Sequence, residues 1–239
     1  MRSIIITITS KLKWVFLALS FSGILNNLFD YPIFNQLRLI GLFGFFILYF
    51  LEIPISVFFQ SLYQIFGNAY IYISNRFKLP SKDNYVCKID YILPFNGKWT
   101  VVNGGVNKSL SHSWGILSQR YAYDFIILDN EGKVSEGTKK SCKNYYCYGK
   151  DIIAPADGYV VKVAKKYKDS YVDGKNAFCD SADIRGNYII IKHNDNEYSL
   201  FAHIMSNSIV VDIGDKVKQG EIIAKCGNSG NSSMPHLHF

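Results

Sequence analysis

Charged residues are scarce in the first third of this 239-residue sequence. Residues 1–80 hold six basic residues and only two acidic ones, Asp30 and Glu52, so most of the 26 basic and 19 acidic residues come later. No run of Lys or Arg marks a nucleic-acid-binding surface, and the net charge of +7 supports at most a mild attraction to anionic polymers or lipids. An aromatic content of 15% with ordinary Gly and Pro excludes a disordered or collagen-like chain.

The first third contains long apolar runs, at Trp14–Phe29, Leu39–Leu51 and Ile53–Asn75. A small-residue cleavage site does not follow the first run, which disfavours a cleaved secretory signal. We therefore expect residues 1–80 to be a hydrophobic membrane region with two or three helices, in contact with the lipid bilayer. The last run has helical apolar spacing opposite a polar stripe, which fits an interfacial helix as well as a span. Burial inside a large soluble core is the alternative, and the charge distribution leaves the membrane orientation open.

From about residue 81 to 239 the sequence changes to short β-rich runs between turn signals. We predict a mainly β domain built as an antiparallel barrel-sandwich hybrid. The predicted strands are Tyr123–Leu128, Tyr159–Ala164, Tyr188–His193, Tyr198–His203, Ser208–Val211 and Glu221–Cys226. Two polar stretches, Asp129–Asp151 and Lys165–Arg185, are long enough to be functional or flexible loops.

Five cysteines leave at least one thiol unpaired or available for an intermolecular bond if the domain is exported. Cys142 and Cys147 stand five residues apart in the first long loop. This spacing fits a disulfide that ties the loop better than a zinc site, because the second CxxC of a structural zinc site is missing.

Two of the five histidines occur as His236-Leu237-His238. On a β-strand, side chains two residues apart project from the same face about 6–7 Å apart. Both imidazoles would then face one site, a spacing suited to two ligands or bases around one metal ion. His193, beside Asn194 in a polar turn, is expected to be a surface residue.

Four sequence blocks resemble the lysostaphin-type family of zinc-dependent peptidoglycan endopeptidases. The blocks are Tyr121-Ala-Tyr-Asp124-Phe125, the stretch Asp151 to Val161 with Ala154-Pro-Ala-Asp-Gly158, Leu200-Phe-Ala-His203, and Val211 to Phe239, which ends in Cys226-Gly-Asn-Ser-Gly and HxH. The resemblance covers about residues 95–239 and none of the apolar third.

The resemblance implies a zinc ion held by a His and an Asp of the first motif and by the second His of HxH. Asp124 and His238 match two of these ligands. His236 and His203 would lie beside the metal-bound water as catalytic residues, where they orient or deprotonate it and stabilise the developing charge. Two nitrogens, one carboxylate and an open fourth position also fit catalytic zinc.

The first ligand departs from the family pattern, because the position four residues before Asp124 is Arg120, which cannot lose its proton to bind zinc. The nearest histidine is His112, twelve residues before Asp124, and we expect it to be the first metal ligand. An inert site with only two good ligands is the alternative. The family also continues past HxH into another strand, whereas this sequence stops at Phe239. Either the sequence is a truncated product or its last strand is held by its neighbours alone.

The resemblance implies a membrane-anchored zinc metalloendopeptidase that hydrolyses peptide bonds of bacterial peptidoglycan through a metal-activated water. The domain would then lie outside the bacterial cell membrane, with peptidoglycan peptides as its partners and no nucleic acid. A catalytically inert wall-binding or regulatory module of the same fold is the first alternative. A lipoyl or biotinyl carrier is the second, suggested by Ala154–Gly158 and Gly214–Gly220, with Lys216 as the modified residue.

Overall fold

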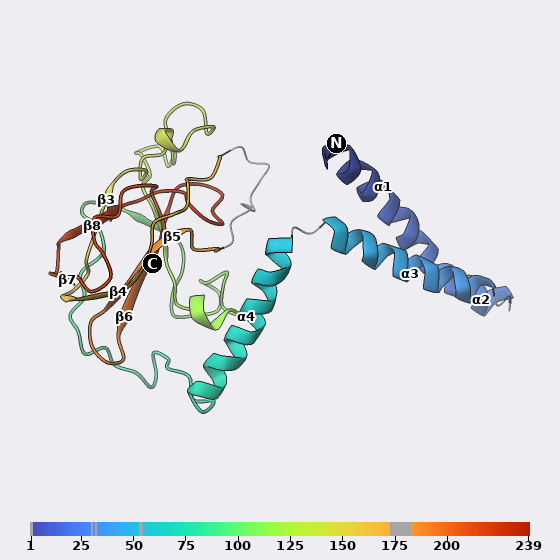
Figure 1. The fold of residues 1–239 in the computed structure, drawn as a ribbon, viewed down its shortest axis with the longest axis horizontal. Coiled ribbons are helices and arrows are strands. Elements are labelled where there is room, and N and C mark those ends of the chain that lie inside the picture. The colour runs from blue at the N-terminus through green and yellow to red at the C-terminus, as the bar shows by residue number, and fades with distance from the viewer. Residues whose placement is uncertain (1, 30, 32, 53–54, 173–182) are drawn as a thin grey trace. The chain divides into compact units, whose positions relative to one another are not determined.

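A computed structural model describes the chain except for residues 1, 30, 32, 53–54 and 173–182 (Figure 1). Contacts divide the chain into two compact units, Met1–Phe59 and Gln60–Phe239. The division falls within a helix and earlier than the expected change after residue 80. The two-domain arrangement with that boundary stays a prediction, and each unit is described by itself.

The first unit is helical. It contains α1 (Arg2–Ser20), α2 (Ser22–Phe29), α3 (Ile33–Glu52) and the beginning of α4 (Ile55–Ser74). Helices α1 and α3 pack closely at Gly41, where a Cβ would lie 2.4 Å from the backbone nitrogen of Ser20. A small residue at such a crossing lets two helix backbones approach. The apolar runs of the sequence therefore form helices, as predicted.

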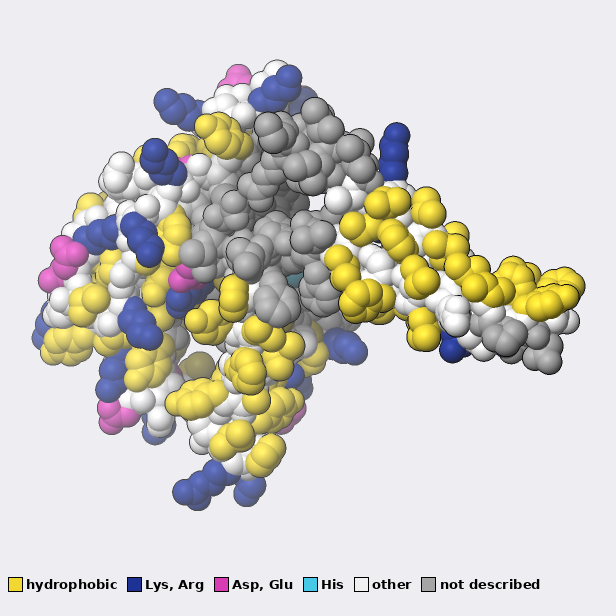
Figure 2. All heavy atoms as spheres, turned by 45° about the vertical axis from the view of Figure 1, so that its right-hand side comes forward, with side chains coloured by type: hydrophobic (Ala, Val, Ile, Leu, Met, Phe, Trp, Pro, Cys, Tyr) yellow, Lys and Arg dark blue, Asp and Glu magenta, His cyan; other side chains and the backbone are white. Residues whose placement is uncertain are grey.

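Many large apolar side chains of these helices are exposed, among them Trp14, Phe43 and Ile65. Figure 2 shows hydrophobic side chains gathered along the helical segments, whereas Lys and Arg side chains are spread over the β part. Among the helices that the structure describes, none combines the length and the hydropathy needed to cross a bilayer. The expectation of two or three membrane-spanning helices is therefore not supported.

The second unit is mainly β and antiparallel, as predicted. In its described residues, one sheet has the order β1-β2-β9-β6-β5-β4-β7 and a second sheet pairs β3 with β8 (Figure 1). The strands are β1 (Thr100–Asn103), β2 (Asp124–Ile126), β3 (Asp151–Ile153), β4 (Gly158–Ala164), β5 (Asn187–Lys192), β6 (Tyr198–Ile204), β7 (Lys216–Val217), β8 (Ile222–Lys225) and β9 (Leu237–His238).

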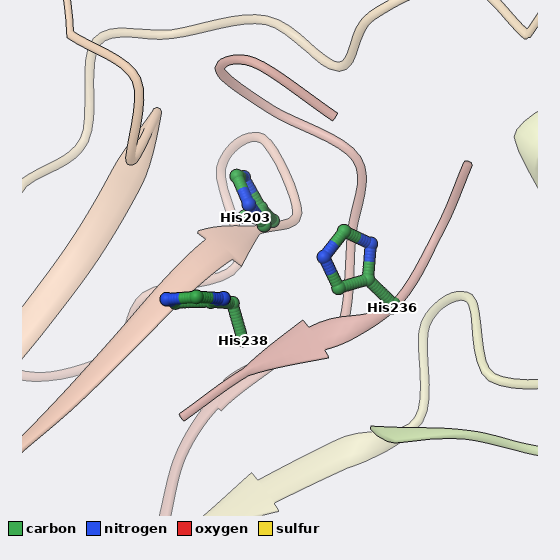
Figure 3. A group of neighbouring side chains, drawn as sticks. All are labelled: His203, His236 and His238. Atoms are coloured by element: carbon green, nitrogen blue, oxygen red, sulfur yellow. The ribbon is translucent and has the colours of Figure 1, made fainter. Parts of the chain in front are cut away.

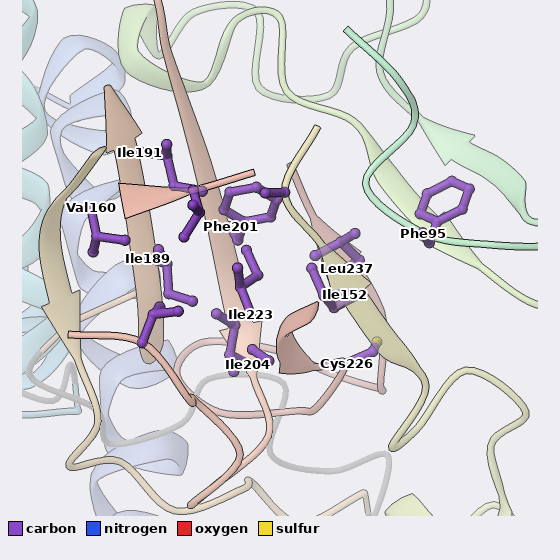
Figure 4. Packing of buried hydrophobic residues seen from close by; sticks show 14 of the residues in the cluster. Phe95, Ile152, Val160, Ile189, Ile191, Phe201, Ile204, Ile223, Cys226 and Leu237 are labelled. Atoms are coloured by element: carbon purple, nitrogen blue, oxygen red, sulfur yellow. The ribbon is translucent and has the colours of Figure 1, made fainter. Parts of the chain in front are cut away.

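The hydrophobic core of the second unit takes side chains from both sheets (Figure 4). Ile189 and Phe201 come from the larger sheet, and Ile152 and Ile223 come from the smaller one; all four are fully buried. Along β5 the side chains alternate between buried and half-buried, which is the pattern of a strand with one face on a core. The opposite face of the larger sheet is thereby left available for polar side chains.

One predicted strand is absent from the described residues. Ser208–Val211 forms no ladder, and Val210 makes a single backbone bond to Ile223 (3.1 Å). Val211 is nevertheless buried in the core, so its apolar character serves packing and not strand pairing. Lys216 pairs with Tyr159 within a strand ladder and does not occupy a hairpin tip, which removes the feature that a lipoyl or biotinyl carrier requires.

A buried carboxylate fastens the segment after α4 to the β unit. Glu197 accepts hydrogen bonds from the Tyr85 hydroxyl (2.9 Å), the Lys88 backbone nitrogen (2.7 Å) and the Tyr91 hydroxyl (2.8 Å). These bonds hold the pKa of Glu197 down at about 2, chiefly through the Lys88 nitrogen, against the effect of burial. The carboxylate therefore stays ionised at neutral pH and anchors residues 85–91.

Candidate metal centre

The candidate site lies on a row of residues that crosses the larger sheet. Asp124 on β2 pairs with Asn103 on β1 and with His238 on β9, and His238 pairs with Ala202 on β6. Side chains at paired positions project from the same face of an antiparallel sheet. The sequence folds in this way because Phe125 and Leu237, the next residues on β2 and β9, are buried in the core and direct their neighbours outward.

The structure brings the side chains of Asp124, His236 and His238 together at this row. The Nδ1 atom of His238 lies 2.7 Å from Oδ1 of Asp124, and Nε2 of His236 lies 3.6 Å from the same oxygen. All three side chains are only 13–14% exposed. The carboxylate and the two rings therefore share one shielded site.

His203 joins the two HxH rings from the end of β6 (Figure 3). One ring nitrogen from each of His203, His236 and His238 lies within 4.8 Å of the others, which is the spacing of ligands around one metal ion. The His203 ring centroid is 4.7 Å from that of His236 and 5.7 Å from that of His238. His203 has a φ of 59°, a rare conformation for a residue other than glycine, and such strain is typical of functional sites.

Backbone carbonyls orient two of these rings. His203 Nδ1 lies 2.8 Å from the Ser229 carbonyl oxygen, and His236 Nδ1 lies 2.8 Å from the Met234 carbonyl oxygen. A carbonyl can only accept, so each Nδ1 carries the proton and donates it. Each Nε2 is then left with a free lone pair, which can bind a metal ion or accept a proton.

The electrostatics keep the rings of His203 and His236 neutral and the Asp124 carboxylate ionised. Burial lowers the pKa of His203 well below its usual value, and it also lowers the pKa of His236. Burial alone would raise the pKa of Asp124, but the hydrogen bond from His238 and the nearby imidazoles lower it. Neutral imidazoles beside an ionised carboxylate are the protonation states in which these groups bind a divalent cation.

The predicted first ligand, His112, approaches Asp124 from the other side. Its Nδ1 atom lies 4.0 Å from Oδ2 of Asp124, and its side chain is 63% exposed. The Asn103 amide sits between them: its Nδ2 contacts His112 Nδ1 and lies 3.0 Å from Asp124 Oδ2, while its Oδ1 accepts from the His112 backbone nitrogen (3.0 Å). His112 is thus close to the site but outside the cluster of three imidazoles, and its role as a ligand stays a prediction.

Sequence reasoning missed Asn103. The residue ends strand β1 and is followed by Gly104, whose backbone nitrogen donates to the Leu110 carbonyl oxygen (2.8 Å) and closes the loop that leads to His112. No signal in the sequence marked it, because β1 has only four residues and its pairing with β2 is known only from the structure. His193, expected at the surface, is half-buried: its ring nitrogens contact the Asp157 carbonyl oxygen (2.8 Å) and the Ser199 hydroxyl (2.7 Å).

The loop between β8 and β9 is packed against the segment before β5. A Cβ on Gly230 would lie 2.3 Å from the backbone nitrogen of Gly186, so only glycine permits this approach. The buried Asn228 donates to the Ser170 carbonyl oxygen (2.9 Å) and accepts from the Ser232 hydroxyl (2.7 Å). These contacts fix the loop whose Ser229 and Met234 carbonyls orient the two imidazoles.

The donor set fits zinc. Zinc is bound in proteins by imidazole nitrogen and carboxylate oxygen, with three protein ligands in catalytic sites. Asp124 and the ring nitrogens of His203, His236 and His238 provide more donors than three, so some of these residues are available for roles other than ligation. The predicted division of roles, with Asp124, His238 and His112 as ligands and His203 and His236 as catalytic residues, stays a prediction.

Comparisons with known proteins identify the class of this domain. Residues 137–239 match Peptidase family M23. The match includes His203, His236 and His238, and it begins after His112 and Asp124. The chain therefore carries a domain of peptidase family M23, as its resemblance to lysostaphin-type enzymes predicted.

Two curated relatives illustrate the match. The chain is 36% identical over 131 residues to the murein hydrolase activator NlpD of Salmonella dublin, which covers 55% of this chain and 30% of that protein. It is 35% identical over 91 residues to an uncharacterized metalloprotease of Haemophilus influenzae, which covers 38% of this chain and 16% of that protein. The chain thus spans less than a third of the length of either relative.

Among solved structures, a zinc-containing peptidase from Vibrio cholerae matches 61% of this chain and 34% of its own, with 22% sequence identity and a TM-score of 0.39.

Proposed function

We propose that the chain is a zinc metalloendopeptidase that hydrolyses peptide bonds of bacterial peptidoglycan. One observation carries the proposal: the Asp124 carboxylate and the imidazoles of His203, His236 and His238 converge on one side of the sheet. The match of residues 137–239 to a peptidase family supports hydrolysis of peptide bonds as the reaction. The wall substrate is supported by the murein-related name of the NlpD relative.

In this proposal Asp124, His238 and His112 hold the zinc ion. Zinc bound there would supply Lewis-acid activation of water and of the scissile carbonyl. The neutral His236 and His203 can each accept a proton at Nε2, because their Nδ1 protons are committed to backbone carbonyls. A proton taken at Nε2 during attack is then available for the leaving amine, and the resulting imidazolium is stabilised by the nearby Asp124 carboxylate.

Zinc content and release of peptides from purified cell wall test this proposal together. The wild-type chain should bind about one zinc ion, lose lytic activity with a chelator and regain it with zinc. Asp124→Ala and His238→Ala should lose both zinc and activity, whereas His236→Gln should keep zinc and lose most activity. Asp212→Asn, on the exposed surface, is the control. The proposal fails if the zinc-loaded wild type releases no peptide from any wall preparation.

A non-catalytic wall-binding or regulatory module is the second candidate. Two observations favour it: a relative bears the name murein hydrolase activator, and Arg120 occupies the position of the expected histidine ligand. Under this proposal His112→Ala leaves zinc content and cell-wall phenotype unchanged, and the domain binds wall material without cutting it. Loss of zinc in His112→Ala, with loss of lytic activity, would favour the enzyme.

We also propose that the helical region associates with a membrane surface and keeps the M23 domain outside the cell. The exposed Trp14, Phe43 and Tyr63 are aromatic side chains of the kind that enter membrane interfaces, and Lys11 and Lys13 could meet anionic lipid headgroups. Flotation of the full chain with vesicles of mixed neutral and anionic lipid tests this proposal. A Trp14→Ser/Phe43→Ser variant should float less, and equal flotation of both proteins would contradict it.

A further inference from the structure

Two cysteines that are far apart in the sequence, Cys147 and Cys226, lie together in the core of the β unit. Each is only 1% exposed, and both belong to the same cluster of buried side chains, where Figure 4 shows Cys226. The spacing of Cys142 and Cys147 had instead suggested a disulfide between those two residues. All three thiols are free in the structure.

The backbone holds Cys147 beside Cys226. The Cys226 nitrogen donates to the Lys150 carbonyl oxygen (2.8 Å), and the Gly149 nitrogen donates to the Cys226 carbonyl oxygen (2.8 Å). The Lys150 nitrogen donates to the Cys147 carbonyl oxygen (3.2 Å), which closes a turn. The turn therefore places Cys147 next to Cys226, whose backbone nitrogen bonds to Lys150.

The side chains show the same pairing. The Cys147 and Cys226 thiols are close enough to hydrogen-bond, an interaction that lowers the pKa of Cys147, while burial raises the pKa of Cys226. The Cys142 thiol is directed elsewhere: its Sγ atom lies 3.4 Å from the Ser170 carbonyl oxygen, and it is only half-buried.

We propose that Cys147 and Cys226 form an intramolecular disulfide in the mature protein. Formation takes two protons and two electrons from the pair of thiols, and a small-molecule disulfide such as oxidised glutathione accepts them and leaves as two thiols. Because both thiols are buried in the folded chain, the exchange takes place during folding. An oxidising compartment outside the cytoplasm, which the proposed function implies, supplies such oxidants.

The bond would act directly on the candidate metal centre. Cys226 is followed by the loop whose Ser229 carbonyl orients His203, and the Cys147 Sγ atom lies 3.1 Å from the carbonyl oxygen of Pro235, the residue before His236. A disulfide here ties the long loop Asp129–Asp151 to the start of the loop that carries these carbonyls. Closing a loop of about 80 residues should raise the Tm by about 5–15 °C.

Disulfide mapping of the full chain tests the inference. The protein is refolded from denaturant in detergent with a mixture of reduced and oxidised glutathione, alkylated without reduction, digested and analysed by mass spectrometry. We expect one linked pair of peptides that contain Cys147 and Cys226, with Cys87 and Cys142 alkylated. Alkylation of both Cys147 and Cys226, or a link from either one to Cys142 or Cys179, would overturn the proposal.

Single substitutions distinguish a specific disulfide between Cys147 and Cys226 from unspecific oxidation of other thiols. Cys142→Ser should keep the linked peptides, and reducing agent should lower its Tm by the same 5–15 °C as for the wild type, roughly. Cys147→Ser and Cys226→Ser should lose the link, and reducing agent should not change their Tm. Neither measurement depends on zinc or wall digestion, so the disulfide and the proposed function can fail independently.

Discussion

The helical unit and the β unit place their apolar side chains in opposite ways. In the β unit Phe201 is fully buried, together with Ile189 and Ile223, and charged side chains are spread over the face that Figure 2 shows. In the helical unit Phe43 is 71% exposed, as are many of its large apolar neighbours. The β unit thus buries its apolar groups within its own fold, whereas the described helices leave a contiguous set of theirs uncovered, a feature that marks interaction surfaces.

The comparison predicts that equal substitutions have very unequal effects in the two units. Phe201→Ala removes a fully buried ring that also packs against Phe239, and it should lower the free energy of unfolding of the β unit by about 3–5 kcal/mol. Phe43→Ala should change it by less than about 0.5 kcal/mol. Urea unfolding followed by near-ultraviolet circular dichroism measures both, and a loss for Phe43→Ala similar to that for Phe201→Ala would contradict the comparison.

The second prediction concerns the carboxylate that fastens the segment between α4 and the β unit. Glu197 has a folded pKa of about 2, below its value of about 4.5 in an unfolded chain, so the unfolded state binds more protons at intermediate pH. Its contribution to stability is present above pH 4.5 and is lost as the pH falls toward 2. Glu197→Gln should therefore flatten the decline in stability over this range, measured by urea unfolding at several pH values.

The exposed Glu136→Gln is the control for this measurement. A decline that is equally steep in Glu197→Gln and in the wild type would show that the three hydrogen bonds to Glu197 do not stabilise the folded chain.

The smallest predicted effect lies at the contact between α4 and the segment that carries His112. The Asn68 side chain donates to the Gly115 carbonyl oxygen (3.1 Å) and accepts from the Leu117 nitrogen (2.9 Å). Asn68→Ala should cost about 1 kcal/mol locally, so amide hydrogen exchange of residues 113–119 should rise by about fivefold. Asn75→Ala is the matched control, because Asn75 bonds only to nearby residues of the helix end. Equal exchange in both variants would contradict the prediction.

The longest strands, β4, β5 and β6, could be predicted because each is rich in β-branched and aromatic residues and lies between turn signals. Strands β4, β5, β6 and β8 lie within a residue or two of the predicted ranges. Strands β1, β3 and β7 have two to four residues, too few to show a period, and they form because longer neighbours offer hydrogen-bonding edges. The prediction of a strand at Ser208–Val211 was wrong. β-branched residues favour a strand in the sequence, but in this run only one side chain, Val211, is buried, and the run forms no strand ladder.

The site was predictable where side chains carry the chemistry and unpredictable where the backbone does. The HxH pair could be found from its spacing, and Asp124 and His203 from the resemblance of their sequence blocks to a known family. The carbonyls of Ser229 and Met234, which decide the tautomers of His203 and His236, have no signature in the sequence. The Cys147 and Cys226 contact was equally hidden, since only the fold brings those two segments together.

The strand order has a consequence for when the site can exist. Strand β9 is the last in the chain, yet it lies between β2 and β6 in the middle of the larger sheet. During synthesis on a ribosome, Asp124 on β2 and His203 on β6 would emerge well before His236 and His238. The position between β2 and β6 would stay vacant until β9 has been made. The cluster of imidazoles would then be complete only after β9 has paired with both β2 and β6.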